Sequence, residues 1–230
     1  VFSLRLHYSQ KVATFAPDNN NANSLFRNMI KNILFDMGGV IITINQTEAV
    51  RRFKEIGLQD ADVWLNPYLQ KGIFGEVEEG NISGEEFCDK LGNIIGRTVS
   101  WDECMYGWMG YVQEVPQRNL DTLLKLKKEG YRLMLLSNTN PFIAHWMMSE
   151  EFDGKGNSLR YYLHEAYMSF CCGCMKPSEQ FYNHVINSEK INPDETLFLD
   201  DGVNNINAAK ALGINTFLVE NGKDWTKEIY

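Results

Sequence analysis

The sequence lacks two features that would place it in particular classes of protein. No apolar run approaches the ~20 residues needed to cross a bilayer, so we expect no membrane-spanning segment. Basic residues are outnumbered, with 22 Lys and Arg against 30 Asp and Glu. The resulting net charge of −8 argues against nucleic acid or an anionic membrane as a partner, because both need a basic surface. An anionic ligand would therefore need a local positive charge, from a cation or a lysine.

Cysteine and histidine are also scarce, with five and four residues in 230. Three of the cysteines crowd into the sequence CCGC at 171–174, and adjacent cysteines rarely satisfy disulfide geometry. The cysteines do not supply the four suitably spaced ligands of a zinc site, and the histidines lack metal-ligand spacing. We therefore interpret the cysteines as reduced thiols and expect a cytoplasmic protein.

The first 28 residues differ in composition from the rest of the chain. They include the polar stretch PDNNNANS and lack the apolar core of a signal peptide. Met29 stands directly before the first predicted strand. We expect residues 1–28 to form an N-terminal extension outside the fold.

Short apolar runs alternate with helical patterns through most of the chain. Four near-continuous apolar runs predict strands buried on both faces, at 31–36, 131–137, 196–200 and 214–220, and 161–170 is a weaker candidate. Helical patterns fill 116–130, 176–190 and 204–213, with Pro116 at the start of the first and Gly213 after the last. Strands that alternate with helices predict an α/β fold with a doubly wound parallel sheet.

The interval between the first two predicted strands is far longer than one crossover helix needs. Residues 45–115 within it are rich in aromatic residues, Met and Glu and contain no clear strand. Ser83 to Glu86, with the sequence SGEE, has the pattern of a capping box that opens a helix. We therefore predict an α/β core made of residues 29–44 and 116–230, with a helical domain of residues 45–115 inserted after the first strand.

Polar residues follow the ends of the predicted strands. Because the carboxyl ends of parallel strands meet at one edge of a sheet, where open α/β sheets bind their ligands, we expect these side chains to converge. The residues concerned are Asp36, Ser137, Asn138, Lys176, Asp200 and Asp201.

This set of residues suits the transfer of a phosphoryl group. A carboxylate such as Asp36 can attack phosphorus in line and form an acyl-phosphate. The nucleophile and the phosphoryl group are both anionic, so the site needs a cation, and Asp36 with Asp201 would supply carboxylate oxygens to Mg²⁺. Ser137 and the backbone N–H groups after it can hold phosphoryl oxygens, and Lys176 adds positive charge.

The motifs FDMGGV, LLSNTN, MKP and FLDDGVNN, in this order and at these strand ends, resemble the haloacid dehalogenase (HAD) superfamily of phosphohydrolases. The resemblance covers roughly residues 30–220 and implies a Rossmann-like HAD core, with residues 45–115 as a small helical cap that selects the substrate. The resemblance implies that Asp36 is the nucleophile, Ser137 the phosphate-binding hydroxyl and Lys176 the conserved lysine. It also implies that Asp201 and the backbone carbonyl of Gly38 are further Mg²⁺ ligands. Asp200 and Asn205 match residues that orient the lysine and the metal waters.

Gly38 departs from the pattern that most phosphatases of the superfamily share. They carry an Asp at this position, which protonates the leaving alcohol and then activates water. A subgroup with Asp-x-Gly includes sugar-1-phosphate phosphatases. We therefore predict a Mg²⁺-dependent phosphohydrolase that acts through an aspartyl-phosphate on a small phosphorylated metabolite, with a hexose-1-phosphate as the favoured substrate. Ser137, Asn138, Lys176 and Glu78, a carboxylate of the cap sequence EEGNIS, are the predicted substrate contacts.

Two other functions fit parts of the same pattern. A metal-free 2-haloacid dehalogenase would share the superfamily motifs, although the clustered carboxylates of Asp200 and Asp201 favour a cation. A phosphate-binding pseudoenzyme would explain why Gly38 replaces the usual acid–base residue. The sequence leaves the oligomeric state open between a monomer and a homodimer.

Overall fold

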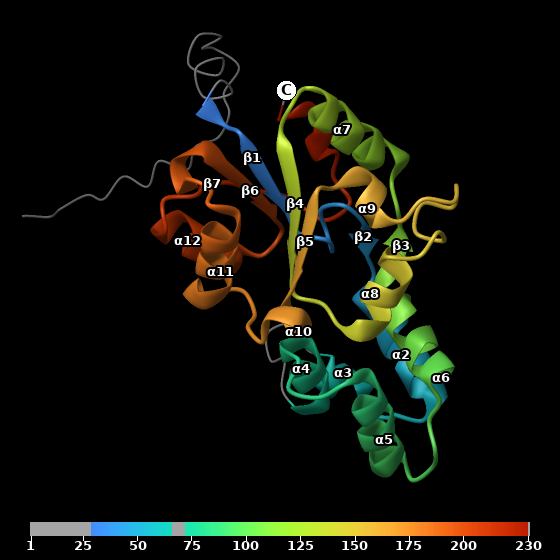
Figure 1. Cartoon of the computed structure of the whole chain (residues 1–230). Helices are drawn as coiled ribbons and strands as arrows, with labels where there is room; N and C mark the ends of the chain where they lie inside the picture. The colour runs from blue at the N-terminus through green and yellow to red at the C-terminus, as the bar shows by residue number, and fades with distance from the viewer. Residues whose placement is uncertain (1–28, 66–71, 230) are drawn as a thin grey trace, which may run out of the picture.

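A five-stranded parallel sheet forms the centre of the computed structural model, which describes residues 29–65 and 72–229 (Figure 1). The strands lie in the order β5-β4-β1-β6-β7, and every neighbouring pair runs parallel. Their bounds are Asn32–Phe35 (β1), Arg132–Ser137 (β4), Glu165–Met168 (β5), Thr196–Asp200 (β6) and Asn215–Leu218 (β7). The predicted doubly wound parallel sheet is confirmed.

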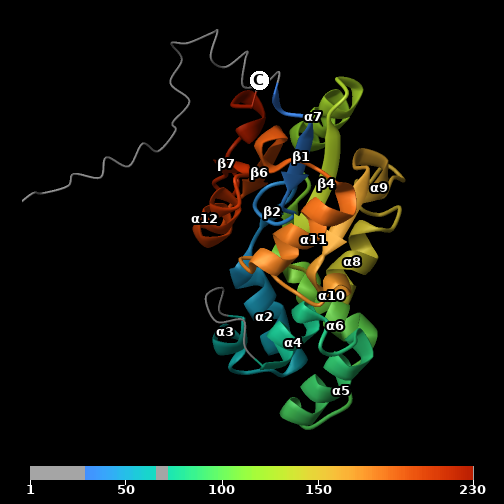
Figure 2. The ribbon, with the colours of Figure 1, turned by 60° about the vertical axis from the view of Figure 1, so that its left-hand side comes forward.

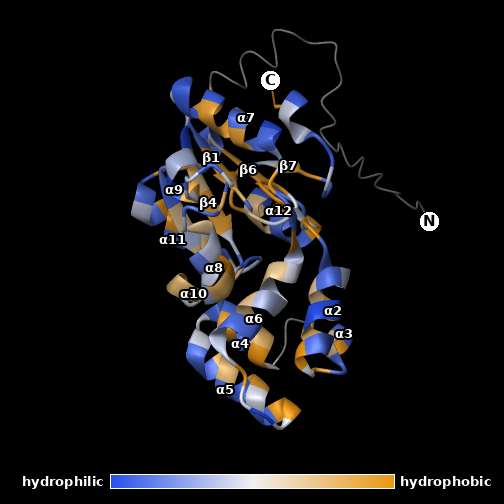
Figure 3. Ribbon diagram, turned by 90° about the vertical axis from the view of Figure 1, so that its right-hand side faces the viewer, coloured by the Kyte–Doolittle hydropathy of each residue, from blue (hydrophilic) through white to orange (hydrophobic). Residues whose placement is uncertain are grey.

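Helices cover both faces of the sheet and create two separate cores. On β1, Ile33 and Phe35 point into the core shared with Leu123 of α7, whereas Leu34 points into the core shared with Phe181 of α11. Both faces of the inner strands β1, β4 and β6 are therefore apolar, as the orange strands of Figure 3 show. The helices of this part are α7 (Gln117–Lys128), α8 (Pro141–Met147), α9 (Leu159–Tyr162), α10 (Ser169–Cys172), α11 (Glu179–Glu189) and α12 (Val203–Ala211), with short 3-10 turns at Pro193–Glu195 (η2) and Trp225–Lys227 (η3). No helix in the described residues has both the length and the apolar character needed to cross a bilayer.

The predicted element boundaries hold closely, with two local differences. Pro116 is the N-cap of α7, so that helix begins one residue later than Pro116. The weak strand candidate 161–170 is divided among the end of α9, the four residues of β5 and the start of α10. Gly213 follows α12 with φ +81, the conformation expected of a glycine that ends a helix.

Between β1 and α7 the chain forms a group of helices attached through two short strands. These helices are α2 (Gln46–Ile56), α3 (Ala61–Trp64), α4 (Gly72–Glu79), α5 (Gly84–Ile95) and α6 (Trp101–Trp108), followed by η1 (Met109–Tyr111). The strands β2 (Thr43–Ile44) and β3 (Val112–Glu114) pair antiparallel at the base of the group. Figures 1 and 2 both show α2 to α6 gathered at one end of the sheet. The sequence pattern misses β3 because three residues are too few to show a period.

The inserted helices have an aromatic core of their own. Phe74 lies with its ring centroid 5.1 Å from both Phe53 and Phe87, and Trp108 lies 5.4 Å from Phe74. The predicted capping box opens α5, because Ser83 Oγ accepts from the N–H of Glu86 and the Glu86 carboxylate accepts from the N–H of Ser83. These helices therefore pack on one another, and α6 and α4 also contact α8 and α10 of the rest of the protein.

The chain between Asp36 and β2 is held by buried polar contacts from distant segments. The Asn119 side chain donates from Nδ2 to the carbonyls of Val40, at 2.9 Å, and Ile41, at 3.1 Å. Trp225 Nε1 donates to the same Val40 carbonyl at 2.8 Å. Asn119 is 2% exposed, so water does not replace these bonds. The backbone that leads away from Asp36 is thereby fixed to α7 and η3.

We predict that Asn119→Leu lowers the free energy of unfolding by about 1–3 kcal/mol, because it removes two buried hydrogen bonds and leaves the Ile41 carbonyl without its side-chain donor. Urea denaturation measures the effect. Gln117→Leu is the matched control on the same helix, since the exposed Gln117 amide bonds only to the Asp121 side chain among the described residues, and it should change stability by less than about 0.5 kcal/mol. Equal effects of the two substitutions would contradict the assigned role of Asn119.

Candidate active site

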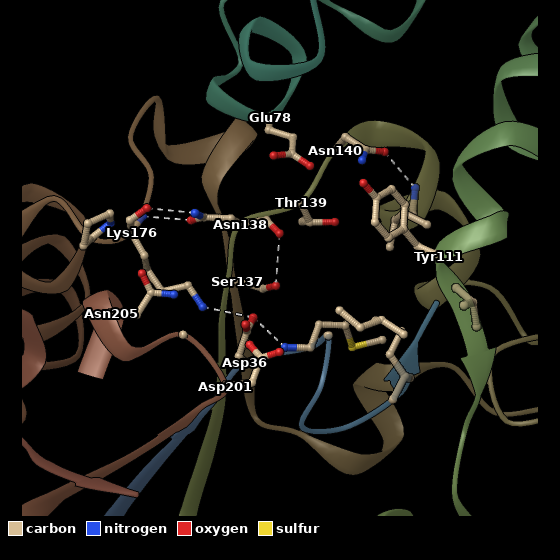
Figure 4. A pocket seen from close by; sticks show the side chains of 18 of the residues that line it. Asp36, Glu78, Tyr111, Ser137, Asn138, Thr139, Asn140, Lys176, Asp201 and Asn205 are labelled. Atoms are coloured by element: carbon tan, nitrogen blue, oxygen red, sulfur yellow. Dashed lines mark hydrogen bonds and ion pairs between the residues drawn. The ribbon is translucent and has the colours of Figure 1, made fainter. Parts of the chain in front are cut away.

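The carboxyl ends of the strands and the inserted helices enclose a cavity of about 880 Å³. Figure 4 shows its floor, formed by Asp36 and Asp201, and its roof, which includes Glu78 of α4. Asp200 is 0% exposed and lies behind this floor. All other predicted site residues line the cavity, namely Asp36, Gly38, Glu78, Ser137, Asn138, Lys176, Asp201 and Asn205.

Lys176 is the buried cation at the floor of the cavity. Its Nζ lies 3.0 Å from Asp36 Oδ1 and 2.6 Å from Asp200 Oδ2, and the residue is 3% exposed. Burial lowers the pKa of Lys176, but the attraction of Asp200 and Asp36 outweighs burial, so the pKa is raised. The lysine therefore stays charged beside Asp36.

Asp200 is held in place on its other side. Its Oδ1 accepts from the N–H of Gly202 at 2.7 Å and from Asn205 Nδ2 at 2.9 Å. The carboxylate thus has partners for both oxygens, which a buried charge requires. Lys176 is in consequence fixed by a carboxylate that cannot rotate away without breaking these bonds.

Asn138 ties the end of β4 to the segment that carries Lys176. Its Oδ1 accepts from the N–H of Lys176 at 2.8 Å, and its Nδ2 donates to the Lys176 carbonyl at 2.9 Å. A second tie joins Ser169 to Thr139, whose N–H donates to Ser169 Oγ at 3.0 Å. Both ends of the Asn138 amide are therefore occupied, and a ligand contact by Asn138 would come from its backbone.

Three carboxylates crowd the floor of the cavity. Asp36, Asp200 and Asp201 each place one oxygen within 4.8 Å of the others. Burial, partly offset by Lys176, raises the pKa of Asp36 to about 6, and burial with the repulsion of Asp36 raises the pKa of Asp201 to about 7. Gly39 has φ +74, and a Cβ there would lie 2.3 Å from Asp201 Oδ2, so only glycine leaves room for this carboxylate. The cluster has more negative charge than Lys176 neutralises.

Tyr111 and Asn140 contribute to the roof, although the sequence analysis did not select them as site residues. Asn140 is the N-cap of α8, with Oδ1 accepting from the N–H groups of Phe142 and Ile143. The sequence Asn140-Pro141 has the pattern of a helix start and could have located this residue. Tyr111 lies in η1 directly before β3, and no sequence pattern indicated that position. Burial and the charge of Glu78 raise the pKa of Tyr111.

Comparison with known proteins gives one consistent family. The family model of the haloacid dehalogenase-like hydrolases matches residues 30–213. A D-ribitol-5-phosphate phosphatase of Bacteroides thetaiotaomicron is 45% identical over 201 residues, which cover 87% of this chain and 97% of that protein.

Solved structures show the same likeness. A predicted HAD-like hydrolase of Porphyromonas gingivalis superposes with a TM-score of 0.83 at 38% identity, covering 87% of this chain and 96% of that one. A HAD-family enzyme of Bacteroides thetaiotaomicron, solved in complex with magnesium and inorganic phosphate, has a TM-score of 0.79 at 32% identity and covers 87% and 100% of the two chains. With its sheet, its strand-end residues and these likenesses in agreement, the chain belongs to the haloacid dehalogenase-like hydrolase family.

Proposed function

We propose that the protein is a Mg²⁺-dependent phosphatase that acts on a small phosphorylated sugar or sugar alcohol. The observation that carries the proposal is the partly buried Asp36 carboxylate, paired with Lys176 at 3.0 Å and facing the same cavity as Ser137 and Asp201. The relative named for D-ribitol 5-phosphate and the structural neighbour solved with magnesium and phosphate support it.

In the proposed reaction Asp36 is the nucleophile. One of its carboxylate oxygens bonds to phosphorus as the bond to the substrate oxygen breaks, and water then hydrolyses the aspartyl-phosphate. Ser137 Oγ and the N–H groups after it donate to phosphoryl oxygens. Lys176 counters the negative charge that builds up on the transferring group. These groups are held in place before substrate binds, because Lys176 and the end of β4 are fixed by the contacts described above.

The donor set of the site fits Mg²⁺. The groups near the floor are carboxylate and carbonyl oxygens, which a hard divalent cation prefers to nitrogen or sulfur ligands. We propose that Asp36, Asp201 and the Gly38 carbonyl hold the ion, which would offset the excess negative charge and polarise the phosphoryl group. The raised pKa values of Asp36 and Asp201 support this, since both carboxylates gain from a neighbouring positive charge.

We further propose that residues 45–115 act as a cap on a core of residues 29–44 and 116–230, with β2 and β3 as the connections between them. Glu78 and Tyr111 reach the cavity from this part of the chain, so it would select the substrate and exclude water. None of the five cysteines forms a disulfide bond, which is consistent with the cytoplasmic location that we propose.

Two types of phosphorylated substrate are candidates for this site. The name of the 45% identical relative favours a pentitol with phosphate on a primary carbon. Gly38 favours a hexose-1-phosphate, because an anomeric oxygen leaves without help from an acid more readily than a primary alkoxide does. We propose the polyol phosphate as the preferred substrate, because the alignment with that relative covers 87% of this chain and 97% of the relative.

The two alternative functions, a metal-free dehalogenase and a phosphate-binding pseudoenzyme, would need other features in the site. A metal-free dehalogenase gains nothing from three carboxylate oxygens gathered within 4.8 Å. A pseudoenzyme that only binds phosphate would need the charge of Lys176, but it has no need of the Asp36 carboxylate held 3.0 Å from that lysine, since a carboxylate repels phosphate. The geometry therefore supports turnover with a cation.

We predict that Asp36→Asn reduces phosphate release by about 10³-fold or more, because it removes the nucleophile without changing shape. Steady-state assay of inorganic phosphate measures this, with circular dichroism to show that the variant is folded. Asp194→Asn, at an exposed position outside the cavity, is the control and should keep the wild-type rate. A folded Asp36→Asn variant with more than a few per cent of the wild-type rate would refute the assigned nucleophile.

We predict that Asp201→Asn stabilises the metal-free protein by about 1–2 kcal/mol at about pH 8, less than the full pKa shift implies because Asp201 is partly exposed. The gain should shrink toward about pH 5. Below its native pKa of about 7, the wild-type carboxyl takes up a proton and loses its unfavourable charge.

Urea denaturation at the two pH values, with and without Mg²⁺, tests this prediction. Mg²⁺ should raise the stability of the wild type and have much less effect on the variant. An equal response of both proteins to Mg²⁺ would remove Asp201 from the proposed ligand set.

The substrate proposal predicts a ranking of kcat/KM. D-ribitol 5-phosphate should be hydrolysed at least about tenfold more efficiently than glucose 1-phosphate and glucose 6-phosphate, a difference of about 1.4 kcal/mol in transition-state binding. A panel of the three compounds at equal Mg²⁺ concentration gives the ranking. If glucose 1-phosphate is the best of the three, the leaving-group argument from Gly38 outweighs the likeness to the named relative.

A further inference from the structure

The position where the usual acid–base side chain would start faces an apolar group. A Cβ added to Gly38 would lie 3.2 Å from Ile44 Cγ2 and 3.8 Å from Ile44 Cδ1. Gly38 has no side chain that could give a proton to the leaving oxygen, and the apolar Ile44 cannot supply one. If the enzyme hydrolyses an alkyl phosphate, a proton donor must reach the cavity from another element.

The carboxyl group of Glu78 lies in the roof, and only one of its oxygens has a hydrogen-bond partner among the described residues. Its Oε2 is buried and has no hydrogen-bond partner among the described residues, although the Asn140 side chain donates to the carboxyl group. Figure 4 shows Glu78 on the opposite side of the cavity from Asp36. An unpartnered buried carboxyl oxygen is costly in a folded protein, and a ligand in the cavity would give it a partner.

The backbone that carries Glu78 is fixed against the core. Gly80, two residues further on, has φ +76, and a Cβ there would lie 2.2 Å from the carbonyl oxygen of Phe170. This approach brings the end of α4 against α10, as Figure 1 also shows. Glu78 therefore stands over the cavity through a direct contact between the inserted helices and the segment just before Lys176.

We propose that Glu78 is the proton donor and acceptor of the reaction, in place of the side chain that Gly38 lacks. The proposal rests on the proposed phosphatase function and adds the residue that completes its chemistry. Glu78 lies across from the nucleophile, on the side from which the leaving group of an in-line displacement departs, and its free Oε2 can face that oxygen.

Both steps balance with Glu78 in this role. In the first step Asp36 bonds to phosphorus, the bond between phosphorus and the substrate oxygen breaks, and that oxygen takes the proton of the Glu78 carboxylic acid. In the second step water bonds to phosphorus, the aspartyl-phosphate bond breaks, and the Glu78 carboxylate takes a proton from the water. The products are the alcohol and inorganic phosphate, and both side chains return to their first state.

The environment of Glu78 suits a group that changes protonation near neutral pH. Burial and, more weakly, the charge of Asp36 raise the pKa of Glu78 to about 7, against the hydrogen bond from Asn140. The apolar side chains of Trp108 and Ile143 line the same cavity. A general acid works best when its pKa lies close to the working pH. The other titratable groups that line the cavity are Asp36, Tyr111, Lys176 and Asp201.

Glu78→Gln tests the proposal with two substrates of different leaving groups. With D-ribitol 5-phosphate, kcat should fall by about 10²–10⁴-fold, the range typical of general acid catalysis. With p-nitrophenyl phosphate, whose leaving group needs no proton, the first step should stay fast and the second should be slow. The variant should therefore release about one equivalent of nitrophenol in a burst and then turn over slowly.

Glu79→Gln is the matched control, since Glu79 is the exposed neighbour on α4 and bonds to the Asn81 side chain. It should show wild-type kinetics and no new burst. Glu78→Asp keeps a carboxyl group, so it should regain part of the rate with D-ribitol 5-phosphate and lose the burst.

Several results would overturn the role of Glu78. They are a wild-type kcat in Glu78→Gln, a rise in KM alone, or the same defect in Glu78→Gln and Glu78→Asp. Failure of the underlying phosphatase proposal looks different. In that case the wild type releases no phosphate from either substrate, or the burst persists in the double variant Asp36→Asn, Glu78→Gln.

Discussion

The ion pairs of Lys176 with Asp36 and Asp200 connect the parts of the molecule on which the site depends. Asp36 follows β1, Asp200 ends β6, and Lys176 stands between β5 and α11, so one ammonium group joins three segments that are far apart in the chain. A buried lysine is tolerated only with well-placed partners, because its desolvation costs several kcal/mol. The bonds of Asp200 to Gly202 and Asn205, and of Asn138 to the Lys176 backbone, are what keep those partners in place.

The same site also holds a negative charge, on Asp201, that destabilises the folded protein. Asp201 lies close to Gly39 and has no cationic partner among the described residues within ion-pair distance. Burial and the repulsion of Asp36 and Asp200 raise its pKa. Sites that bind a cation and a phosphate commonly hold such unfavourable arrangements, since the ligands relieve them. In the proposed reaction, stability and function therefore make opposite demands on this carboxylate, whereas on Lys176 they agree.

Core and inserted helices contribute different chemistry to the cavity. The core supplies the charged floor, with a lysine and three carboxylates fixed by strand ends. The inserted helices supply a roof of Trp108 and Tyr111, with one carboxyl group that is neutral in part near pH 7. A roof of this kind excludes water while leaving a group able to exchange a proton, and its place is set by the contact of Gly80 with Phe170.

The sequence by itself determined the parallel sheet and most of the floor. Continuous apolar runs reveal strands buried on both faces, and a topological rule sends residues that follow such strands to one edge, so Asp36, Ser137 and Asp201 could be placed without coordinates. The tertiary structure alone decided three other matters. They are the use of both ends of the Asn138 amide by Lys176, the filling of the space over Gly38 by Ile44, and the meeting of Glu78, Tyr111 and Asn140 in one roof. The first and third depend on contacts between segments that are distant in the chain, and the second depends on how the chain turns between Asp36 and β2. Neither period nor propensity encodes such contacts.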